Sequence, residues 1–235
     1  MKIYRPLGPI AALSLDLDDT LYDNGPVLEA AEGKLVAWLE ERVKPITDSR
    51  RYFAQWRQRV IQEDPWLAHD TTASRHAALS AGLKAIGVAN AAGLADGAMA
   101  RFLEWRSQAS IGPETHELLT YLSSRKPLIC ISNGNADIQA LGLGQYFQAS
   151  FHAGGSRRMK PAPDLYRAAA EHLKLTPAAI LHVGDRLDHD VAGALEAGLQ
   201  SAWFNTKGDD IRHQARGQLL PHVEISALAS LKQLL

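Results

Sequence analysis

The sequence predicts an α/β protein built on a parallel, doubly wound sheet, with a helical domain inserted after the first strand. Short apolar runs that suit buried strands alternate with segments of helical period, which is the pattern of parallel α/β sheets. More than a hundred residues separate Asp19, after the first run, from Ser132, at the end of the second, although a parallel crossover needs only about a dozen. An inserted domain is the simplest explanation of that length.

Four short apolar runs are the predicted strands. The first, at residues 10–17 (IAALSLDL), leads into an acidic cluster of Asp16, Asp18 and Asp19. Three further runs each follow a segment with helical period and lie at residues 127–132, 180–184 and 200–205. Continuous apolar runs of this length are typical of buried strands. We therefore expect a buried sheet whose first strand carries polar chemistry at its carboxyl end.

The inserted segment has helical periodicity throughout. Apolar residues recur at helical spacing in four stretches, which are separated by breaks at residues 44–45, 64–65 and 87–93. This pattern predicts a small bundle of four helices. Trp38, Trp56 and Trp105 share its apolar faces, so we expect these rings to fill the bundle core rather than to stack on a ligand. For Trp66, beside Pro65 at a break, both alternatives stay open.

Composition and charge exclude several classes of function. The 25 basic and 26 acidic residues give a net charge of −1, and no block of like charges marks a nucleic-acid or anionic-membrane binder. No apolar stretch approaches the ~18 residues that span a bilayer, and the amino terminus does not have the pattern of a signal peptide. We therefore expect a cytoplasmic protein. Cys130, the single cysteine, lies in an apolar run and is expected to be a small buried side chain.

Two acidic side chains follow the first strand on the same side. The two-residue period of a strand turns Asp16 and Asp18 to one face, at the sheet edge where α/β proteins bind ligands. Two unit charges ~4 Å apart repel by about 4 kcal/mol at an effective dielectric of about 20, and a divalent cation between them reverses the sign. Hard oxygen ligands favour Mg²⁺. The alternative is a solvated acidic turn in which Asp18 or Asp19 caps a helix.

Another predicted strand also ends in an acid. The run at residues 180–184 is followed by Asp185, and Asp188 and Asp190 precede a predicted helix at residues 191–197. Because the carboxyl ends of parallel strands meet on one edge of a sheet, Asp16 and Asp185 are expected to build a metal site between them. For Asp190 alone, a simpler alternative is the N-cap of the following helix.

Polar groups that suit a phosphoryl group complete the pattern. Ser132, Asn133 and Gly134 lie at the end of the second run, and a hydroxyl with backbone N–H groups can hold phosphoryl oxygens. An ordinary Asn-Gly turn is the alternative there. Lys160 stands in a basic stretch, where it is either a solvated side chain or the cation that neutralises a transferred phosphoryl group.

In this order, the four elements resemble the motifs of the haloacid dehalogenase (HAD) superfamily. The stretches that carry the resemblance are Asp16-x-Asp18-x-Thr20, Ser132 at a strand end, Lys160 ahead of a helix, and Gly184-Asp185-x4-Asp190. The resemblance implies a Rossmann-like catalytic core at residues 1–24 and 111–235, with a parallel sheet of strand order 5-4-1-2-3. The inserted residues 25–110 are similar to the helical C1 cap of that superfamily.

The resemblance also implies a role for each core residue. Asp16 would be the nucleophile that forms an aspartyl-phosphate, and Asp18 would protonate the leaving alkoxide and then deprotonate the hydrolytic water. The implied cofactor is Mg²⁺, held by the carboxylates of Asp16 and Asp185 and by the backbone carbonyl of Asp18. Ser132 and Lys160 would hold the phosphoryl oxygens. Supporting roles would fall to Thr20, which braces the loop, and to Asn133, Gly134 and Asp190.

Several activities are compatible with the resemblance. Dehalogenases of the superfamily lack an aspartate at the position of Asp18, so its presence favours phosphoryl chemistry. A sugar phosphomutase would keep every core residue and differ only in its cap. A catalytically silent binding protein is the alternative of a different class, and the intact core positions argue against it. We therefore expect a Mg²⁺-dependent phosphomonoesterase.

Further stretches resemble the bacterial flavin mononucleotide phosphatases of this subfamily, which are also linked to the ribitylaminouracil phosphate of riboflavin biosynthesis. These stretches are Tyr4-Arg5-Pro6-Leu7-Gly8, residues 15–24, His69-Asp70 with Thr72 and Arg75, Trp105-Arg106-Ser107, and Leu220-Pro221-His222. This sequence departs from the pattern of those phosphatases around Ala73-Ser74, where bulkier side chains are expected. The resemblance implies a small phosphorylated metabolite as substrate, with a phosphatase of another sugar or nucleotide phosphate as the alternative. We expect a monomer or weak dimer.

The break at residues 69–75 is the expected specificity region of the cap. A polar cluster of His69, Asp70, Thr72 and Arg75 interrupts helices of apolar period, and we expect it to contact the part of the substrate beyond the phosphate. In the simpler alternative, Asp70 or Thr72 is an N-cap and Arg75 is a solvated helix residue.

Overall fold

The predicted strands form the centre of a mainly parallel sheet. The computed structural model describes residues 1–213 and 219–235. The first strand is β2, and every one of its residues is buried. The central parallel strands are β2 (Ala12–Leu15), β3 (Leu128–Ser132), β4 (Ala149–His152), β5 (Ile180–Gly184) and β6 (Gln200–Phe204). The α/β class expected from the alternating pattern is confirmed.

The sheet is larger than the five strands that the resemblance implies. Its order is β1-β7-β6-β5-β2-β3-β4, in which β6-β5-β2-β3-β4 corresponds to the expected 5-4-1-2-3. Beyond β6, the sheet continues with β7 (Val223–Ile225), which is parallel, and β1 (Lys2–Ile3), which is antiparallel. The five-strand expectation was therefore incomplete. These two strands are only three and two residues long, which is too short for an apolar period to reveal them.

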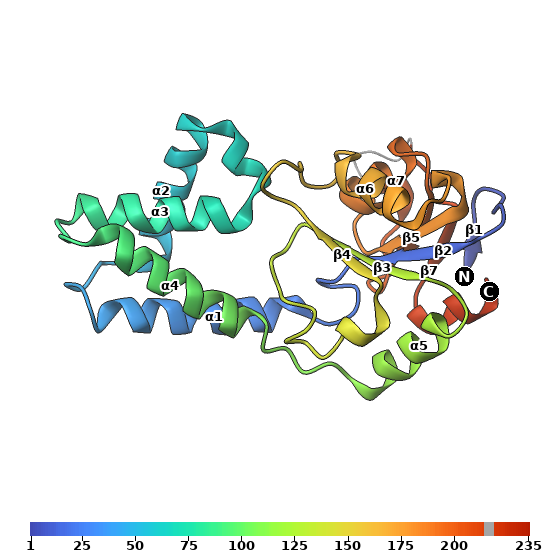
Figure 1. Ribbon diagram of the computed structural model, residues 1–235, viewed down its shortest axis with the longest axis horizontal. Coiled ribbons are helices and arrows are strands. Elements are labelled where there is room, and N and C mark those ends of the chain that lie inside the picture. Colours follow the sequence, from blue (N-terminus) through green and yellow to red (C-terminus); the bar gives the residue numbers. More distant parts are fainter. Residues whose placement is uncertain (214–218) are drawn as a thin grey trace.

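Helices cover both faces of the sheet, as Figure 1 shows. Helix α5 (Pro113–Ser123) lies on one face, and α6 (Asp164–Leu173) and α7 (Ala192–Glu196) lie on the other. Residues of β3 alternate between the two buried clusters, with Leu128 and Cys130 in one and Ile129 and Ile131 in the other. Cys130 has the expected buried position, where burial raises the pKa of its thiol to about 12.

Four helices follow the first strand and pack around an apolar cluster of their own. They are α1 (Asn24–Glu40), α2 (Ser49–Glu63), α3 (Thr71–Ala85) and α4 (Ala91–Arg106), with a 3₁₀ turn at Pro65–His69. The cluster includes Leu35, Leu83 and Phe102, with Trp38 and Trp105 packed against it. Side-chain caps begin α1 and α3, where Asp23 and Asp70 accept from backbone N–H groups. We call helices α1 to α4 the helical cap.

The helical cap lies beyond the carboxyl edge of the sheet (Figure 1). It meets the core at the turn before α3, where the exposed ring of Trp66 donates from Nε1 to the carbonyl oxygen of Gly155 at 2.8 Å. Among the described residues, no helix is long and apolar enough to span a membrane.

Candidate active site

The loop after β2 holds the first acidic pair at the carboxyl edge of the sheet. The N–H of Asp16 donates to the carbonyl oxygen of Val183 on β5, at 2.9 Å. The backbone then turns back on itself, because Leu21 donates to the carbonyl oxygen of Leu17 and Asp19 adopts a left-handed conformation with φ 59°. Asp19 also accepts from the N–H of Asn24, at the start of α1. The loop is thus tied to the first helix of the cap.

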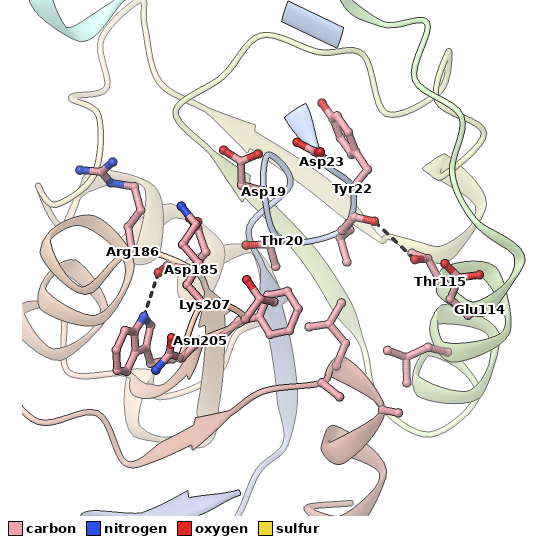
Figure 2. A pocket seen from close by; sticks show the side chains of 18 of the residues that line it. Asp19, Thr20, Tyr22, Asp23, Glu114, Thr115, Asp185, Arg186, Asn205 and Lys207 are labelled. Atoms are coloured by element: carbon pink, nitrogen blue, oxygen red, sulfur yellow. Dashed lines mark hydrogen bonds between the residues drawn. The ribbon is translucent and has the colours of Figure 1, made fainter. Parts of the chain in front are cut away.

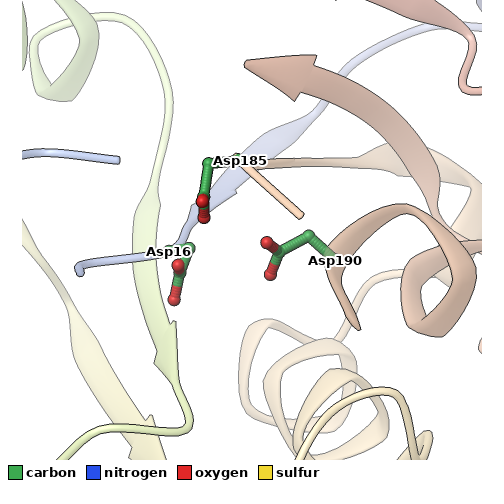
Figure 3. Close-up of side chains that lie close together, drawn as sticks. All are labelled: Asp16, Asp185 and Asp190. Carbon is green, nitrogen blue, oxygen red and sulfur yellow. The ribbon is translucent and has the colours of Figure 1, made fainter. Parts of the chain in front are cut away.

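Three carboxylates from two neighbouring strand ends converge, as Figure 3 shows. One oxygen each of Asp16, Asp185 and Asp190 lies within 4.8 Å of the others. Asp185 follows β5, and Asp190 comes from the π-helical turn Leu187–Val191 that follows it. A Cβ at Gly184 would collide with the Asp190 carboxylate, so only glycine permits this approach. The convergence expected of Asp16 and Asp185 is present, and Asp190 joins it rather than capping a helix.

Lys160 lies between two of these carboxylates and is 2% exposed. Its Nζ donates to Oδ1 of Asp16 and Oδ1 of Asp190, both at 2.6 Å, and to the carbonyl oxygen of Ile131 at 3.1 Å. All three ammonium donors therefore have partners. Burial disfavours the charge, but the two carboxylates outweigh burial and raise the pKa of Lys160 above its ordinary value. The solvated alternative for Lys160 is wrong.

A buried histidine holds Asp190 from its other side. His182 Nε2 lies 3.2 Å from Oδ1 of Asp190, and Nδ1 lies 2.9 Å from Oγ of Ser14. Burial lowers the pKa of His182, so the neutral ring donates to the carboxylate and accepts from the serine hydroxyl. Burial alone would raise the pKa of Asp190, but Lys160 and His182 hold it well below the ordinary value. Asp190 is thereby a fixed anion next to Lys160.

The charge balance of this cluster fits a divalent cation. Burial raises the pKa of Asp16, the charge of Lys160 opposes the rise, and the charge of Asp190 adds to it. Burial, together with the charges of Asp190 and Asp19, raises the pKa of Asp185 to about 6. One ammonium group thus faces three carboxylates, and a second positive charge would balance the excess negative charge. Their oxygen-only donor set is the one that Mg²⁺ prefers.

The loop after β3 packs against both Lys160 and Asp18. The side chain of Asn133 accepts from the N–H of Lys160 at 2.7 Å and donates to its carbonyl oxygen at 3.0 Å. Ser132 is buried and its Oγ accepts from the N–H of Gly134. A Cβ at Gly134 would collide with the Asp18 carboxylate. Ser132, Asn133 and Gly134 therefore lie beside the acidic cluster, and Asn133 fixes the backbone of Lys160.

Thr20 is also buried, and its role in bracing the loop stays a prediction. Its hydroxyl oxygen makes no hydrogen bond with any residue in the described part of the chain. The loop is held by backbone hydrogen bonds to Leu17 from Thr20 and Leu21.

Arg106, at the end of α4, reaches Asp18 and was not assigned a role from the sequence. It is 3% exposed, and its Nη2 lies 2.7 and 2.6 Å from the two oxygens of Asp18. Tyr22 completes the contact: its hydroxyl donates to Asp18 at 2.5 Å and accepts from Nη1 of Arg106 at 2.9 Å. The one available signal was the stretch Trp105-Arg106-Ser107, which contributed to the resemblance without suggesting a contact.

The predicted specificity residues of the cap do not all lie in one place. Asp70 caps α3 and also accepts from the N–H of Gly155 in the core, while Thr72 accepts from Nδ2 of Asn135 at 3.0 Å. Arg75 pairs with Glu32 at 3.1 Å and stacks on the ring of Phe102 inside the cap. The solvated alternative for Arg75 is therefore wrong. His69 packs edge-on against Trp66.

A wide groove of about 1160 Å³ flanks the outer side of the loop after β2 (Figure 2). Asp19, Thr20 and Tyr22 line it on one side, and Asp185 and Lys207 line it on another. Of the three converging carboxylates of Asp16, Asp185 and Asp190, only that of Asp185 belongs to a residue that lines this groove. Asp16 and Lys160 are not among its lining residues.

Comparisons with known proteins agree with the geometry. The model of the haloacid dehalogenase-like hydrolase family matches residues 10–198. Over 241 residues, which cover all of both chains, the sequence is 41% identical to 5-amino-6-(5-phospho-D-ribitylamino)uracil phosphatase YigB of Escherichia coli (strain K12). It is also 28% identical over 141 residues, 56% of each chain, to human (Homo sapiens) N-acylneuraminate-9-phosphatase.

Solved structures share the fold over nearly the whole chain. The crystal structure of a 2-haloacid dehalogenase from Pseudomonas syringae pv. Tomato DC3000 matches with a TM-score of 0.88 and 34% identity, over 95% of this chain and 97% of that one. The magnesium-bound structure of the putative HAD-hydrolase YfnB from Bacillus subtilis matches with a TM-score of 0.67 and 21% identity, over 97% of this chain and 99% of that one. The resemblance drawn from the motifs is confirmed, and the chain belongs to the haloacid dehalogenase-like hydrolase family, in which it is a phosphatase.

Proposed function

We propose that the protein is a Mg²⁺-dependent phosphomonoesterase that acts through an aspartyl-phosphate on Asp16. Its proposed substrate is 5-amino-6-(5-phospho-D-ribitylamino)uracil or flavin mononucleotide. The observation that carries the proposal is the convergence of Asp16, Asp185 and Lys160 at one edge of the sheet, with Asp18 two residues after Asp16. The relative in Escherichia coli, named for the ribitylamino uracil substrate, supports the choice of substrate.

The proposed reaction has two steps, and Asp18 recovers in the second step a proton to replace the one that it donates in the first. A carboxylate oxygen of Asp16 attacks phosphorus, and the bond from phosphorus to the leaving oxygen breaks as that oxygen takes a proton from Asp18. Asp18 then removes a proton from water, whose oxygen attacks phosphorus and releases phosphate and free Asp16. Asp16, Asp185 and the backbone carbonyl of Asp18 would hold Mg²⁺, which supplies charge stabilisation of the phosphoryl group.

Lys160 and Asp18 must both exchange partners for this chemistry. Because the three donors of Lys160 are already used, contact with a phosphoryl oxygen requires that one of them leaves its partner. Both oxygens of Asp18 contact Arg106, so delivery of a proton requires that one of these contacts opens. Ser132 and the N–H groups of its loop are the remaining proposed ligands of the phosphoryl oxygens.

The experiment measures phosphate release from both proposed substrates, with Mg²⁺ and after EDTA treatment. Turnover is expected only with Mg²⁺. Asp16→Asn is expected to abolish it, and Asp18→Asn to lower it by ~10²–10⁴-fold, the usual contribution of a general acid or base. Near-normal activity of Asp16→Asn, or activity that survives EDTA, contradicts the mechanism. Transfer of phosphate within a hexose 1-phosphate, without release, would establish a phosphomutase instead.

We also propose a cytoplasmic location and a monomer or weak dimer. The wide groove of Figure 2 touches the proposed metal site through Asp185.

A further inference from the structure

A second cavity lies within the helical cap, between α1, α2 and α3. Its volume is about 350 Å³, within the range of small-molecule sites. The walls are mainly apolar, with Leu35, Leu39, Phe53 and Leu79 among the lining residues. The charged lining residues are four arginines and one glutamate: Arg50, Arg51, Arg57, Arg75 and Glu32. Such a cavity suits an apolar ring with hydrogen-bond acceptors on its edge.

Arg57 is the unusual member of this set. It is half-buried, and its Nε donates to Oγ of Ser74 at 2.9 Å. Unlike Arg75, which pairs with Glu32, Arg57 forms no ion pair with a carboxylate among the described residues. Burial and the nearby charge of Arg75 lower the pKa of Arg57, and the charge of Glu32 opposes them only in part. A half-buried guanidinium without a direct ion pair favours a ligand that brings acceptors to its terminal nitrogens.

Two of the three helices around the cavity begin beside the candidate active site. Helix α1 follows the loop that carries Asp16, and Thr72, in the first turn of α3, accepts from Asn135 in the loop after β3. Arg75 is three residues after Thr72, an advance of ~4.5 Å along the helix axis.

We infer that this cavity is the subsite for the ring end of the substrate and takes a planar ring with carbonyl oxygens on its edge. The inference rests on the proposed function, whose two substrates each join a ribityl phosphate chain to a pyrimidinedione ring. Arg57 and Arg75 donate to the carbonyl oxygens, Glu32 accepts from a ring N–H, and the apolar walls contact the ring faces. Arg57 and Glu32 thus become specificity-determining residues.

The first test compares substrates with and without the ring. For the unchanged protein, Arg57→Met and the matched control Arg59→Met, kcat/KM is measured with flavin mononucleotide and with D-ribitol 5-phosphate, which has the chain but no ring. Arg59 is on the same helix but is exposed and outside the cavity lining. Arg57→Met is expected to lower the kcat/KM for flavin mononucleotide, relative to that for D-ribitol 5-phosphate, by ~10- to 100-fold. This is the range for a lost hydrogen bond to a charged group. Arg59→Met keeps the ratio of the two kcat/KM values.

Equal losses with both substrates overturn the subsite, because Arg57 would then act on the fold or on the phosphate end of the substrate. No loss with either substrate overturns it as well, because Arg57 would then not contact the ring. A second measurement separates this failure from failure of the proposed function. Calorimetric titration with dephosphorylated 5-amino-6-ribitylaminouracil reports ring binding without any turnover. Binding that Arg57→Met weakens at least ~10-fold, and Arg59→Met does not, supports the subsite even if neither phosphate ester is hydrolysed. No binding to the unchanged protein overturns it, whatever the protein hydrolyses.

Discussion

Arg106 of the helical cap and Asp18 of the core form a partly buried ion pair in which one guanidinium nitrogen contacts both carboxylate oxygens. Arg106 is the last residue of α4, so the pair joins the end of the cap to the loop that also carries Asp16. Asp18 is the proposed proton donor and acceptor. The position of the cap helix is thereby linked directly to the position of the proton-transfer group.

From this pair we predict that Arg106→Met lowers kcat for every phosphomonoester while leaving KM nearly unchanged. The loss should be ~10²-fold, because a misplaced catalytic group costs about that much. Steady-state kinetics with flavin mononucleotide and p-nitrophenyl phosphate would measure it, and Arg106→Lys should recover part of kcat. Thermal unfolding of each variant separates loss of position from loss of fold. A loss confined to flavin mononucleotide would instead make Arg106 a specificity residue.

Removal of the metal tests the proposed Mg²⁺ site at Asp16 and Asp185. Dialysis against EDTA is expected to abolish phosphate release, and added Mg²⁺ to restore it. Asp185→Asn should raise the Mg²⁺ concentration for half-maximal activity by at least ~10-fold, since it removes a carboxylate ligand. Asp188→Asn is the matched control, because Asp188 is exposed and pairs with Arg186. An identical Mg²⁺ requirement in both variants would exclude Asp185 from the metal site.

Lys160→Met is expected to destabilise the metal-free protein strongly. The substitution leaves Asp16 and Asp190 buried without their shared cation, and breaking a buried ion pair from one side costs ~3–5 kcal/mol in free energy of unfolding. Mg²⁺ should reduce the loss by restoring positive charge. Urea unfolding with EDTA and with Mg²⁺ measures both effects, with the exposed Lys84→Met as control. If Lys160→Met and Lys84→Met unfold at the same urea concentration, the cluster does not depend on this charge.

The pair of Arg158 and Asp164 closes the loop that carries Lys160, and its contribution should depend on pH. Hydrogen bonds from Arg158 lower the pKa of Asp164 to about 2, below its ordinary value of 3.8. The folded state therefore favours the ionised carboxylate. The resulting stability is complete above the ordinary pKa and is lost as the pH falls toward about 2.

Asp164→Asn should accordingly lower the urea midpoint at neutral pH, and its difference from the unchanged protein should shrink from about pH 5 to about pH 3. Glu171→Gln, an exposed change on the same helix, should show no such pH dependence. A difference for Asp164→Asn that is constant over this range would mean that the pair contributes nothing through charge.

The central strands and the acidic cluster could be predicted because their signals are local. Each of the four apolar runs is a short stretch of consecutive residues, and Asp16 and Asp185 stand where two of those runs end. The rule that parallel strand ends share one edge of the sheet then brings them together. The role of Lys160 could be predicted only with the help of the family resemblance, because a lysine in a basic stretch has no local feature that distinguishes burial from solvation.

The contacts between cap and core could not be predicted in this way. Arg106 is 88 residues from Asp18, and nothing in the helical period of α4 separates an arginine that enters the active site from one that faces solvent. Arg57 and Glu32 were missed for the same reason, since their shared cavity depends on how three helices pack. Contacts at long sequence separation require the packing angles of the helices, which periodicity does not contain.

The buried position of Cys130 makes the protein suited to spectroscopic labelling. The chain has no other cysteine, and a thiol with a pKa of about 12 carries almost no reactive thiolate at neutral pH. Maleimide dyes would therefore attach only to cysteines introduced by design. A fluorophore pair at Arg59 on α2 and Glu171 on α6, both exposed, would report the separation of cap and core in single molecules during turnover.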